Sequence, residues 1–338
     1  MDTNLSLTLF IRAFLIALIM LVPYEYYWNH VKHWPRSYDV ESLGLWANER
    51  SKLDKLSSED IVIMGSSRGH FDLNMKLWDS IMGRKPVMLA YPGSSPFHPI
   101  ADVVENSTFK GLLLISVSPG LFFTVGDSWG AGRGKAFVDH YYNRTYAQRF
   151  NLWVFSFLDP LFGFLDPGLS YRNLTERIRL PNRDSLNHPA IWPPMVSMDR
   201  KRGVRMIPAM ETVTILQKRQ KDIWDRPVWK NRYIDSVDVI LDHYVSLALQ
   251  FKENGGRIAF IRPPVSGAYL ENEPLIYPRK DFWDRLLEES SCPGFQFMDH
   301  PVTNAMEPPE WSHLSRSDAD IYTRLTIDFL KDEELIKD

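Results

Sequence analysis

The stretch Ile61-Val62-Ile63-Met64-Gly65-Ser66-Ser67-Arg68 decides how the rest of the sequence is interpreted. Its first four residues are apolar and mostly β-branched, which is typical of a short buried strand, and Gly65 ends the run. A serine directly after such a strand lies at its carboxyl end, where open parallel sheets bind their ligands. Ser67 is therefore a candidate nucleophile, and the N-cap of a following helix is an equally good interpretation.

Four further apolar runs bounded by breaker residues predict the remaining strands. They are Pro86 to Ala90, Leu112 to Val117, Arg257 to Ile261 and Phe295 to Met298. Helical patterns cover Ser42 to Leu56, Ser236 to Glu253 and Ser315 to Glu333, the last beginning with the capping box Ser315-Arg316-Ser317-Asp318. Because strands alternate with helices, the sequence predicts an α/β fold, a three-layer sandwich with a mostly parallel central sheet.

This alternation fails between Pro119 and about Asp235, where Pro, Trp, Phe and Arg are frequent. We interpret residues 120–235 as a helical and irregular insertion. The basic cluster Arg200-Lys201-Arg202, with Arg205, lies inside it, and such clusters usually form solvated loops. Binding of a phosphate or a lipid headgroup is the alternative.

The N-terminus carries a candidate membrane anchor. Leu5 to Val22 is nearly all apolar, is interrupted by Arg12 and is closed by Pro23, and about 20 such residues cross a bilayer. No small-residue cleavage site follows, so we expect an uncleaved single-pass helix over residues 1–30 and the α/β domain over 31–338. The aromatic residues Tyr24, Tyr26, Tyr27 and Trp28 would lie at the lipid–water boundary. The alternative is an amphipathic helix packed against the domain.

Composition excludes several classes of function. The net charge of −3 gives no basic field for nucleic acid. The single cysteine, Cys292, allows no intramolecular disulfide and no cysteine metal cluster. The sequence also lacks the phosphate-binding loop, the dinucleotide glycine motif and the zinc-binding His-Glu-x-x-His motif, so we expect no metal and no cofactor.

A serine is a weak nucleophile until a base accepts its proton and an acidic group orients that base. Glu310-Trp311-Ser312-His313 follows the last predicted strand, and so supplies His313 as base and Glu310 as its partner. Asp299-His300 is a competing pair, but it lies at the strand end itself and is followed by Pro301.

These motifs resemble the SGNH (GDSL-like) hydrolase superfamily, particularly its membrane-anchored branch associated with acyl transfer to cell-envelope polymers. In that family the nucleophile stands in a Gly-Asp-Ser or Gly-Ser-Ser turn, which matches Ser67. The last block is Asp-x-x-His, which matches Glu310 and His313 with Glu in place of Asp. The resemblance is confined to short blocks near 61–74, 86–98, 111–120, 256–266 and 296–330.

The resemblance also implies an oxyanion hole. Its second block would contribute the N–H of Gly93. The third block normally brings an asparagine, but this chain has Ser116-Val117-Ser118, so Ser118 or a main-chain N–H would have to substitute. Loss of one such donor typically costs about 2.7–4 kcal/mol of transition-state stabilisation. Arg68 and Arg262 would face the same cleft and could bind an anionic substrate group, with a structural ion pair as the alternative.

The function implied is that of a serine esterase or O-acyltransferase acting on cell-envelope glycan or lipid esters through an acyl-enzyme at Ser67. Its partners would be the membrane, an acyl donor and a glycan or lipid acceptor, with a membrane-bound acyltransferase as a further candidate, and its domain would be periplasmic. One rival is a catalytically silent scaffold that binds a polysaccharide or a membrane acyltransferase. Another is a structural α/β domain in which the serines are helix caps.

Overall fold

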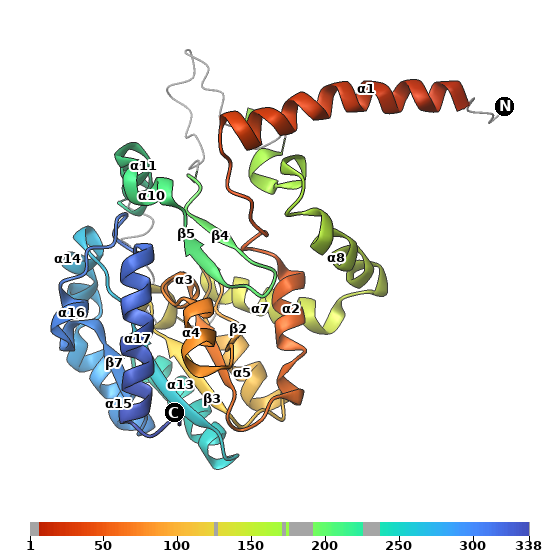
Figure 1. The fold of residues 1–338 in the computed structure, drawn as a ribbon. Helices are drawn as coiled ribbons and strands as arrows, with labels where there is room; N and C mark the ends of the chain where they lie inside the picture. The colour runs from red at the N-terminus through yellow and green to blue at the C-terminus, as the bar shows by residue number, and fades with distance from the viewer. Residues whose placement is uncertain (1–6, 125–127, 171–173, 176–191, 226–236, 338) are drawn as a thin grey trace.

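A five-stranded parallel sheet forms the centre of the molecule (Figure 1). The structure is a computed structural model that describes residues 7–124, 128–170, 174–175, 192–225 and 237–337. The strand order is β2-β1-β3-β6-β7, and each neighbouring pair is parallel. The strands are β1 (Ile61–Gly65), β2 (Val87–Met88), β3 (Leu112–Ser116), β6 (Arg257–Arg262) and β7 (Gly294–Gln296). The predicted mostly parallel central sheet is confirmed.

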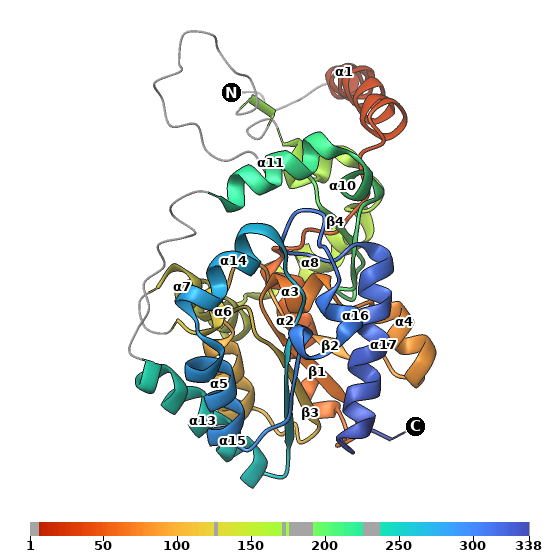
Figure 2. The same ribbon diagram turned by 90° about the vertical axis from the view of Figure 1, so that its left-hand side faces the viewer.

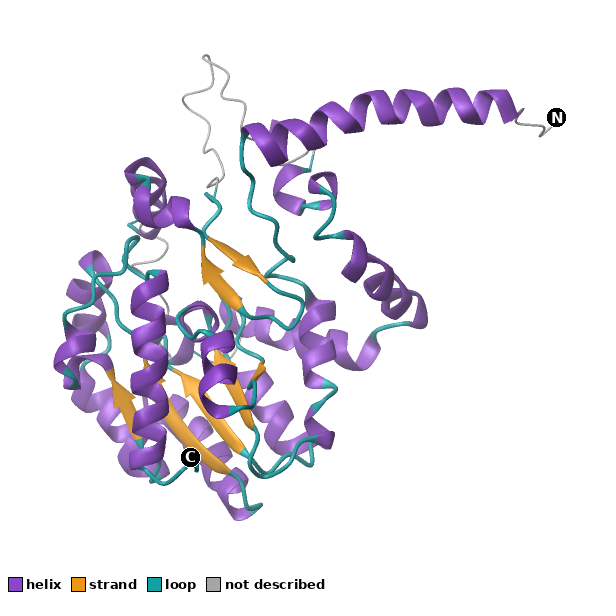
Figure 3. Ribbon diagram, viewed as in Figure 1, coloured by secondary structure: helices purple, strands orange, loops and turns teal. Residues whose placement is uncertain are grey.

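Helices, purple in Figure 3, make up most of the rest of the described chain. Those before β4 are α1 (Leu7–Tyr26), α2 (Leu43–Arg50), α3 (Ser67–Phe71), α4 (Met75–Met82), α5 (Phe97–Asn106), α6 (Pro119–Phe122), α7 (Trp129–Asn143) and α8 (Tyr146–Leu158). Those after β5 are α10 (Pro208–Thr212), α11 (Thr214–Trp224), α13 (Val237–Glu253), α14 (Gly267–Ile276), α15 (Arg285–Ser290), α16 (Pro301–Asn304) and α17 (Arg316–Asp332).

Both faces of the sheet are apolar, as parallel strands require. Along β1, Val62 and Met64 belong to one hydrophobic cluster, while Ile61 and Ile63 belong to another. Figure 2 shows α5 and α13 on one side of the sheet and α4 and α17 on the other. The alternation of side chains along the strands therefore divides the core into two parts.

The observed elements differ from the predicted ones mainly at their ends. β2 is a two-residue strand within the run predicted from Pro86 to Ala90. The helix predicted from Ser42 to Leu56 becomes α2, whose N-cap is Ser42, followed by a 3-10 turn. Ser236, the predicted start of the next helix, lies outside the described residues, and α13 is described from Val237.

A small antiparallel ribbon in the segment between β3 and β6 was not predicted. It consists of β4 (Val196–Met198) and β5 (Val204–Met206), paired in a two-stranded sheet of their own. Asp199 closes the turn between them, because its Oδ1 accepts hydrogen bonds from the main-chain N–H groups of Lys201 and Gly203.

The expectation of a solvated basic loop is wrong for Arg202, which is fully buried. Its guanidinium donates to the carbonyl oxygens of Met88 at 3.2 Å and Ala90 at 2.8 Å, at the end of β2. Burial lowers the pKa of Arg202 to about 10. The buried carbonyl oxygens at the edge of the sheet need donors, and Arg202 supplies them from the ribbon.

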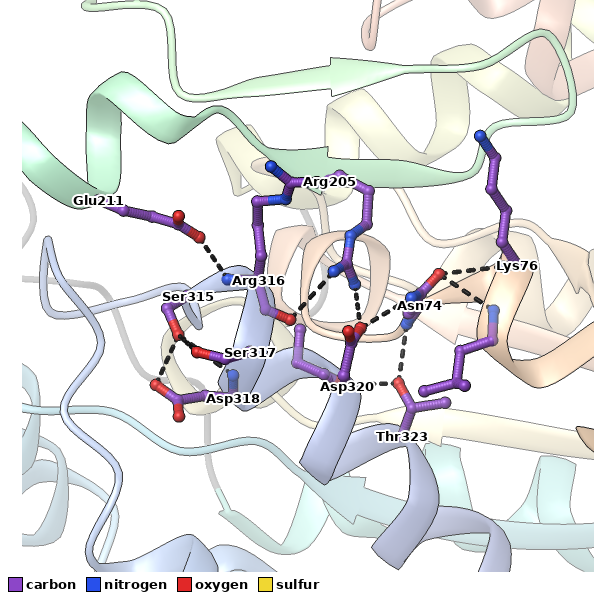
Figure 4. Close-up of polar contacts among 12 residues, drawn as sticks. Asn74, Lys76, Arg205, Glu211, Ser315, Arg316, Ser317, Asp318, Asp320 and Thr323 are labelled. Carbon is purple, nitrogen blue, oxygen red and sulfur yellow. Dashed lines mark hydrogen bonds and ion pairs between the residues drawn. The ribbon is translucent and has the colours of Figure 1, made fainter. Parts of the chain in front are cut away.

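Arg205 joins the ribbon to the start of α17 (Figure 4). It donates to Asp320 and to the carbonyl oxygen of Arg316, and Asp320 also accepts a hydrogen bond from Asn74, the N-cap of α4. Ser315 caps α17 by accepting the N–H of Asp318, which is the first of the two bonds of the predicted capping box, while Asp318 Oδ2 accepts the hydroxyl of Ser315. The ribbon, α4 and α17 are thereby held together directly beside His313.

The N-terminal helix α1 projects from the body of the molecule (Figure 1). With the π-helical turn Tyr27–Val31 it forms a 25-residue helix. An 18-residue window of this helix has a mean hydropathy of 2.2, and none of that window is buried. At 1.5 Å per residue the whole helix is about 37 Å long, more than the roughly 30 Å of a hydrocarbon core. By length and composition it can cross a membrane. Its apolar window is not buried against the domain, which it contacts through its last turns at Tyr24 and Glu25.

Candidate active site

Ser67 is the first residue of α3 and follows the tight turn that ends β1. Gly65 has φ +135°, and a Cβ there would lie 2.6 Å from the carbonyl oxygen of Ser116 on β3, so only glycine fits. Gly65 pairs with Ser116 in the sheet, so the residues that follow β1 and β3 meet at one edge. The sequence thus places Ser67 and Ser118 at the same edge of the sheet.

His313 and Glu310 form a buried pair in the loop before α17. His313 Nδ1 lies 2.8 Å from Glu310 Oε1, and the main-chain N–H of His313 donates to the same oxygen at 2.6 Å. The two side chains are 2% and 0% exposed, so solvent competes little for these bonds. An acceptor at Nδ1 fixes the ring with Nε2 as the atom that can take a proton.

Trp224, at the end of α11, donates its indole N–H to the other oxygen of Glu310. Burial alone raises the pKa of Glu310, but the charge of His313 and the hydrogen bonds from His313 and Trp224 outweigh it and hold that pKa below its usual range. Glu310 is therefore an anion that faces the imidazole, as the orienting carboxylate of a catalytic histidine must be.

The loop that carries His313 is held from two sides. Trp311 has φ +79°, an unfavourable conformation for a bulky residue, and its carbonyl oxygen accepts the N–H of Ser266. Asp72, just after α3, accepts the N–H of Leu314 at 2.9 Å. Asp72 is fully buried, and burial raises its pKa to about 7 against the opposing effects of His313, the Leu314 N–H and Arg68.

A cavity of about 510 Å³ brings the candidate residues together. Ser67, His313, Gly93, Ser118 and Arg68 all line it. Eight aromatic residues contribute to the rest of its wall, and two of them come from the segment that follows α1. Those residues include Trp34, Tyr38, Phe71, Trp129, Trp192, Trp224, Tyr269 and Tyr277.

Several residues of this wall have a buried polar atom with no hydrogen-bond partner in the described part of the chain. Such atoms include His313 Nε2, Ser118 Oγ, Arg68 Nη1 and Arg133 Nε. Orphaned buried polar atoms are rare in folded proteins and are costly unless a ligand or water satisfies them. Because Nε2 has no partner, Ser67 Oγ is not hydrogen-bonded to it in this structure.

Gly93 has φ +65°, and a Cβ there would approach the ring of Trp129 to 3.1 Å. Glycine is therefore required both by the backbone and by the cavity wall. Ser118 is the N-cap of α6 without a side-chain capping bond, which leaves its hydroxyl available. These two residues and Ser67 surround the same space.

Arg68 and Arg262 both form ion pairs with one buried carboxylate, that of Glu273 on α14. Arg68 Nη2 donates to Glu273 Oε1 at 2.6 Å, and Arg262 Nη2 donates to Glu273 Oε2 at 3.1 Å. Burial raises the pKa of Glu273, but the two guanidinium groups outweigh it and hold that pKa below its usual range. Arg262 does not line the cavity, so the ion-pair alternative holds for it, whereas Arg68 lines the cavity and keeps one free donor.

Other predicted candidates lie elsewhere. Asp299 pairs with Arg279 on the surface and is absent from the cavity wall. No three His, Cys, Asp or Glu side chains gather as a metal would need within the described ranges.

Sequence reasoning missed Trp224, Asp72 and Glu273. Each acts through a contact between residues distant in sequence, such as the 86 positions that separate Trp224 from Glu310. The sequence offers one chemical clue to such partners. A histidine or an arginine that is buried needs a partner of opposite charge or a hydrogen bond, but the sequence does not say which distant residue supplies it.

Comparisons of the chain with protein families, with curated proteins and with solved structures found no match.

Proposed function

We propose that this protein is a membrane-anchored serine esterase or O-acyltransferase of the SGNH type, acting on cell-envelope glycan or lipid esters. The fold we propose is the three-layer sandwich of that superfamily, with residues 120–235 as an insertion and the domain on the periplasmic side. The observation that carries the proposal is His313: its Nδ1 is held by buried Glu310, while its orphaned Nε2 belongs to a cavity that Ser67 also lines.

The reaction would follow the usual course of acyl transfer. Ser67 Oγ attacks the acyl carbonyl carbon, and its proton passes to His313 Nε2. The ester C–O bond then breaks, and His313 returns the proton to the departing alcohol, which leaves an acyl group on Ser67. Water or a sugar hydroxyl then attacks the acyl carbonyl carbon while His313 Nε2 takes its proton. The bond between the acyl group and Ser67 Oγ breaks, His313 returns the proton to Ser67 Oγ, and the acid or the new ester leaves.

The oxyanion would be bound by main-chain N–H groups of Ser67 and Gly93. As the first residue of a helix, Ser67 has no intrahelical acceptor for its N–H. Ser118 Oγ would take the place of the asparagine that the third block lacks, since it is buried, unpartnered and in the same wall. Donors fixed in advance toward the developing charge are the main source of such catalysis.

The rival function is a catalytically silent scaffold for a polysaccharide or a membrane acyltransferase. One specific observation favours it, namely that Ser67 Oγ and His313 Nε2 are not hydrogen-bonded to each other. Catalytic hydrogen bonds are often long without substrate and tighten when it binds, so a measurement of turnover is needed to decide between the two functions.

Turnover of p-nitrophenyl acyl esters by the full-length chain in detergent distinguishes the proposed enzyme from the silent scaffold. We expect a burst of nitrophenol, then slower turnover that a sugar-alcohol acceptor accelerates. Ser67→Ala should abolish both phases, while Ser66→Ala, in the same turn but outside the cavity wall, should keep them. Equal turnover by wild type and Ser67→Ala would contradict the proposal.

A further inference from the structure

One face of α8 is aromatic and open to solvent. Tyr146, Phe150, Trp153 and Phe157 are 89%, 65%, 57% and 50% exposed. Their spacing of four, three and four residues puts all of them on one side of a helix. We call these four residues the α8 aromatic face.

The opposite side of α8 fixes the direction of this face. Ser156 is buried, and its carbonyl oxygen accepts the hydroxyl of Tyr38 at 2.8 Å. Leu152 packs on a cluster that contains Leu45 and Phe71. The helix is thus anchored to the body along one side, and the α8 aromatic face cannot turn inward without breaking these contacts.

The exposed rings form a continuous strip. Phe150 and Trp153 have ring centroids 5.8 Å apart, and Trp153 and Phe157 are 5.5 Å apart. The turn after α8 carries three more exposed apolar residues, Leu161, Phe162 and Phe164. Isolated exposed apolar residues are normal, but contiguous apolar patches on a protein surface usually mark an interaction site.

The segment after α8 is hydrogen-bonded to the end of α1 nearest the domain. Glu25 accepts the main-chain N–H groups of Gly163 at 2.9 Å and Phe164 at 2.8 Å, and the hydroxyl of Tyr24 donates to the carbonyl oxygen of Leu169 at 2.7 Å. In Figure 1, α8 lies on the same side of the body as the free length of α1. These hydrogen bonds to Tyr24 and Glu25, at the domain-side end of the apolar helix, keep the turn after α8 close to any membrane that α1 crosses.

Cationic side chains flank the strip. Arg149 lies over the ring of Tyr146 at 5.9 Å, and Arg200 lies over the ring of Phe157 at 4.8 Å. Helices that lie in a membrane interface bury aromatic side chains among the lipids and direct arginines toward the phosphates. The charge pattern therefore fits a lipid surface.

We propose that the α8 aromatic face lies in the lipid–water interface of the membrane that α1 crosses, and so provides a second, non-spanning membrane contact. This inference rests on the proposed membrane anchor. Two contacts restrain the orientation of the domain more than one helix does. They also keep Trp34 and Tyr38, which line the cavity, close to the bilayer, where a lipid-borne acyl donor would arrive.

Site-directed fluorescence in liposomes tests the inference. The full-length chain carrying Phe150→Cys is labelled with the environment-sensitive dye NBD and reconstituted in phosphatidylcholine–phosphatidylglycerol vesicles. The native Cys292 is buried, and burial raises the pKa of its thiol, so the dye reacts at the new cysteine. Tyr146→Cys is a second probe whose side chain touches little, and Asp328→Cys on the exposed side of α17 is the control.

We expect dye at positions 150 and 146 to emit at shorter wavelength and to lose most of its fluorescence when the vesicles contain 5-doxyl lipid, while dye at position 328 is unaffected. If the protein floats with the vesicles but both probes behave like position 328, the anchor stands and the inference is wrong. Probes that are shielded from water yet not quenched by lipid would mean that a second copy covers the face, which also overturns it. A chain that does not float with the vesicles at all refutes the anchor and the inference together.

Discussion

Glu310 is a buried anion whose two oxygens are both occupied by donors from His313 and Trp224. Replacement by glutamine keeps the size of the side chain but removes the charge that orients His313 and stabilises its protonated form. We expect Glu310→Gln to lower kcat/KM for ester substrates by about 10³–10⁴-fold, as for comparable carboxylates in catalytic triads.

Steady-state ester kinetics measure this change. Glu307→Gln, on an exposed glutamate three residues earlier, is the matched control and should leave kcat/KM unchanged. If the two variants behaved alike, Glu310 would have only a structural role.

The raised pKa of Asp72 predicts an unusual dependence of the protein's stability on pH. Burial raises its pKa in the folded protein to about 7, against 3.8 for an ordinary aspartate. The folded state therefore holds this proton more tightly than the unfolded state. The free energy of unfolding falls as pH rises from about 4 to about 7, by at most about 4 kcal/mol from this group.

Asp72→Asn removes the titrating group and keeps an oxygen for the N–H of Leu314. We expect its melting temperature in detergent to match wild type near pH 4 and to exceed it increasingly toward pH 8. Asp328→Asn, on an exposed aspartate, should show no such trend. A constant difference between Asp72→Asn and wild type at every pH would contradict this account.

Among the elements, α11 connects the segment between β3 and β6 to Glu310, and so to the proposed catalysis. Trp224→Phe keeps a ring in the cavity wall but removes the N–H that binds Glu310. A hydrogen bond to a charged group is worth about 1.5–3 kcal/mol, so we expect kcat to fall by about 10–100-fold.

Parallel kinetics of Trp192→Phe provide the control, because this change removes another indole from the same cavity wall and leaves the Trp224–Glu310 hydrogen bond in place. Trp192→Phe should change KM more than kcat. A larger loss of kcat in Trp192→Phe than in Trp224→Phe would argue against a role for the indole N–H.

The sheet was predictable from the sequence because parallel strands buried on both faces leave short apolar runs, such as Ile61 to Met64. The same reasoning located His313, since a loop after the last strand returns to the edge where Ser67 lies. It could not find β4 and β5, whose three residues each give no periodicity. Nor could it find the pairing of Arg68 and Arg262 with Glu273, because ion pairs between distant residues are set by packing.

For the whole molecule, the proposed topology has α1 in the membrane and the α/β domain on the periplasmic side. We expect Asp328→Cys to react with a membrane-impermeant maleimide in intact bacterial spheroplasts, because this position is exposed. The wild-type chain, whose single cysteine is buried, should not react. Labelling that appears only after lysis would place the domain in the cytoplasm.

The most direct test of the central claim is labelling of the purified full-length chain with a fluorophosphonate probe, which reacts only with an activated serine. The account predicts that wild type and Ser66→Ala are labelled, that the adduct maps to Ser67, and that Ser67→Ala and His313→Ala are not labelled. A folded wild-type protein that takes no label, or a Ser67→Ala variant labelled like wild type, would contradict the claim and favour a silent scaffold.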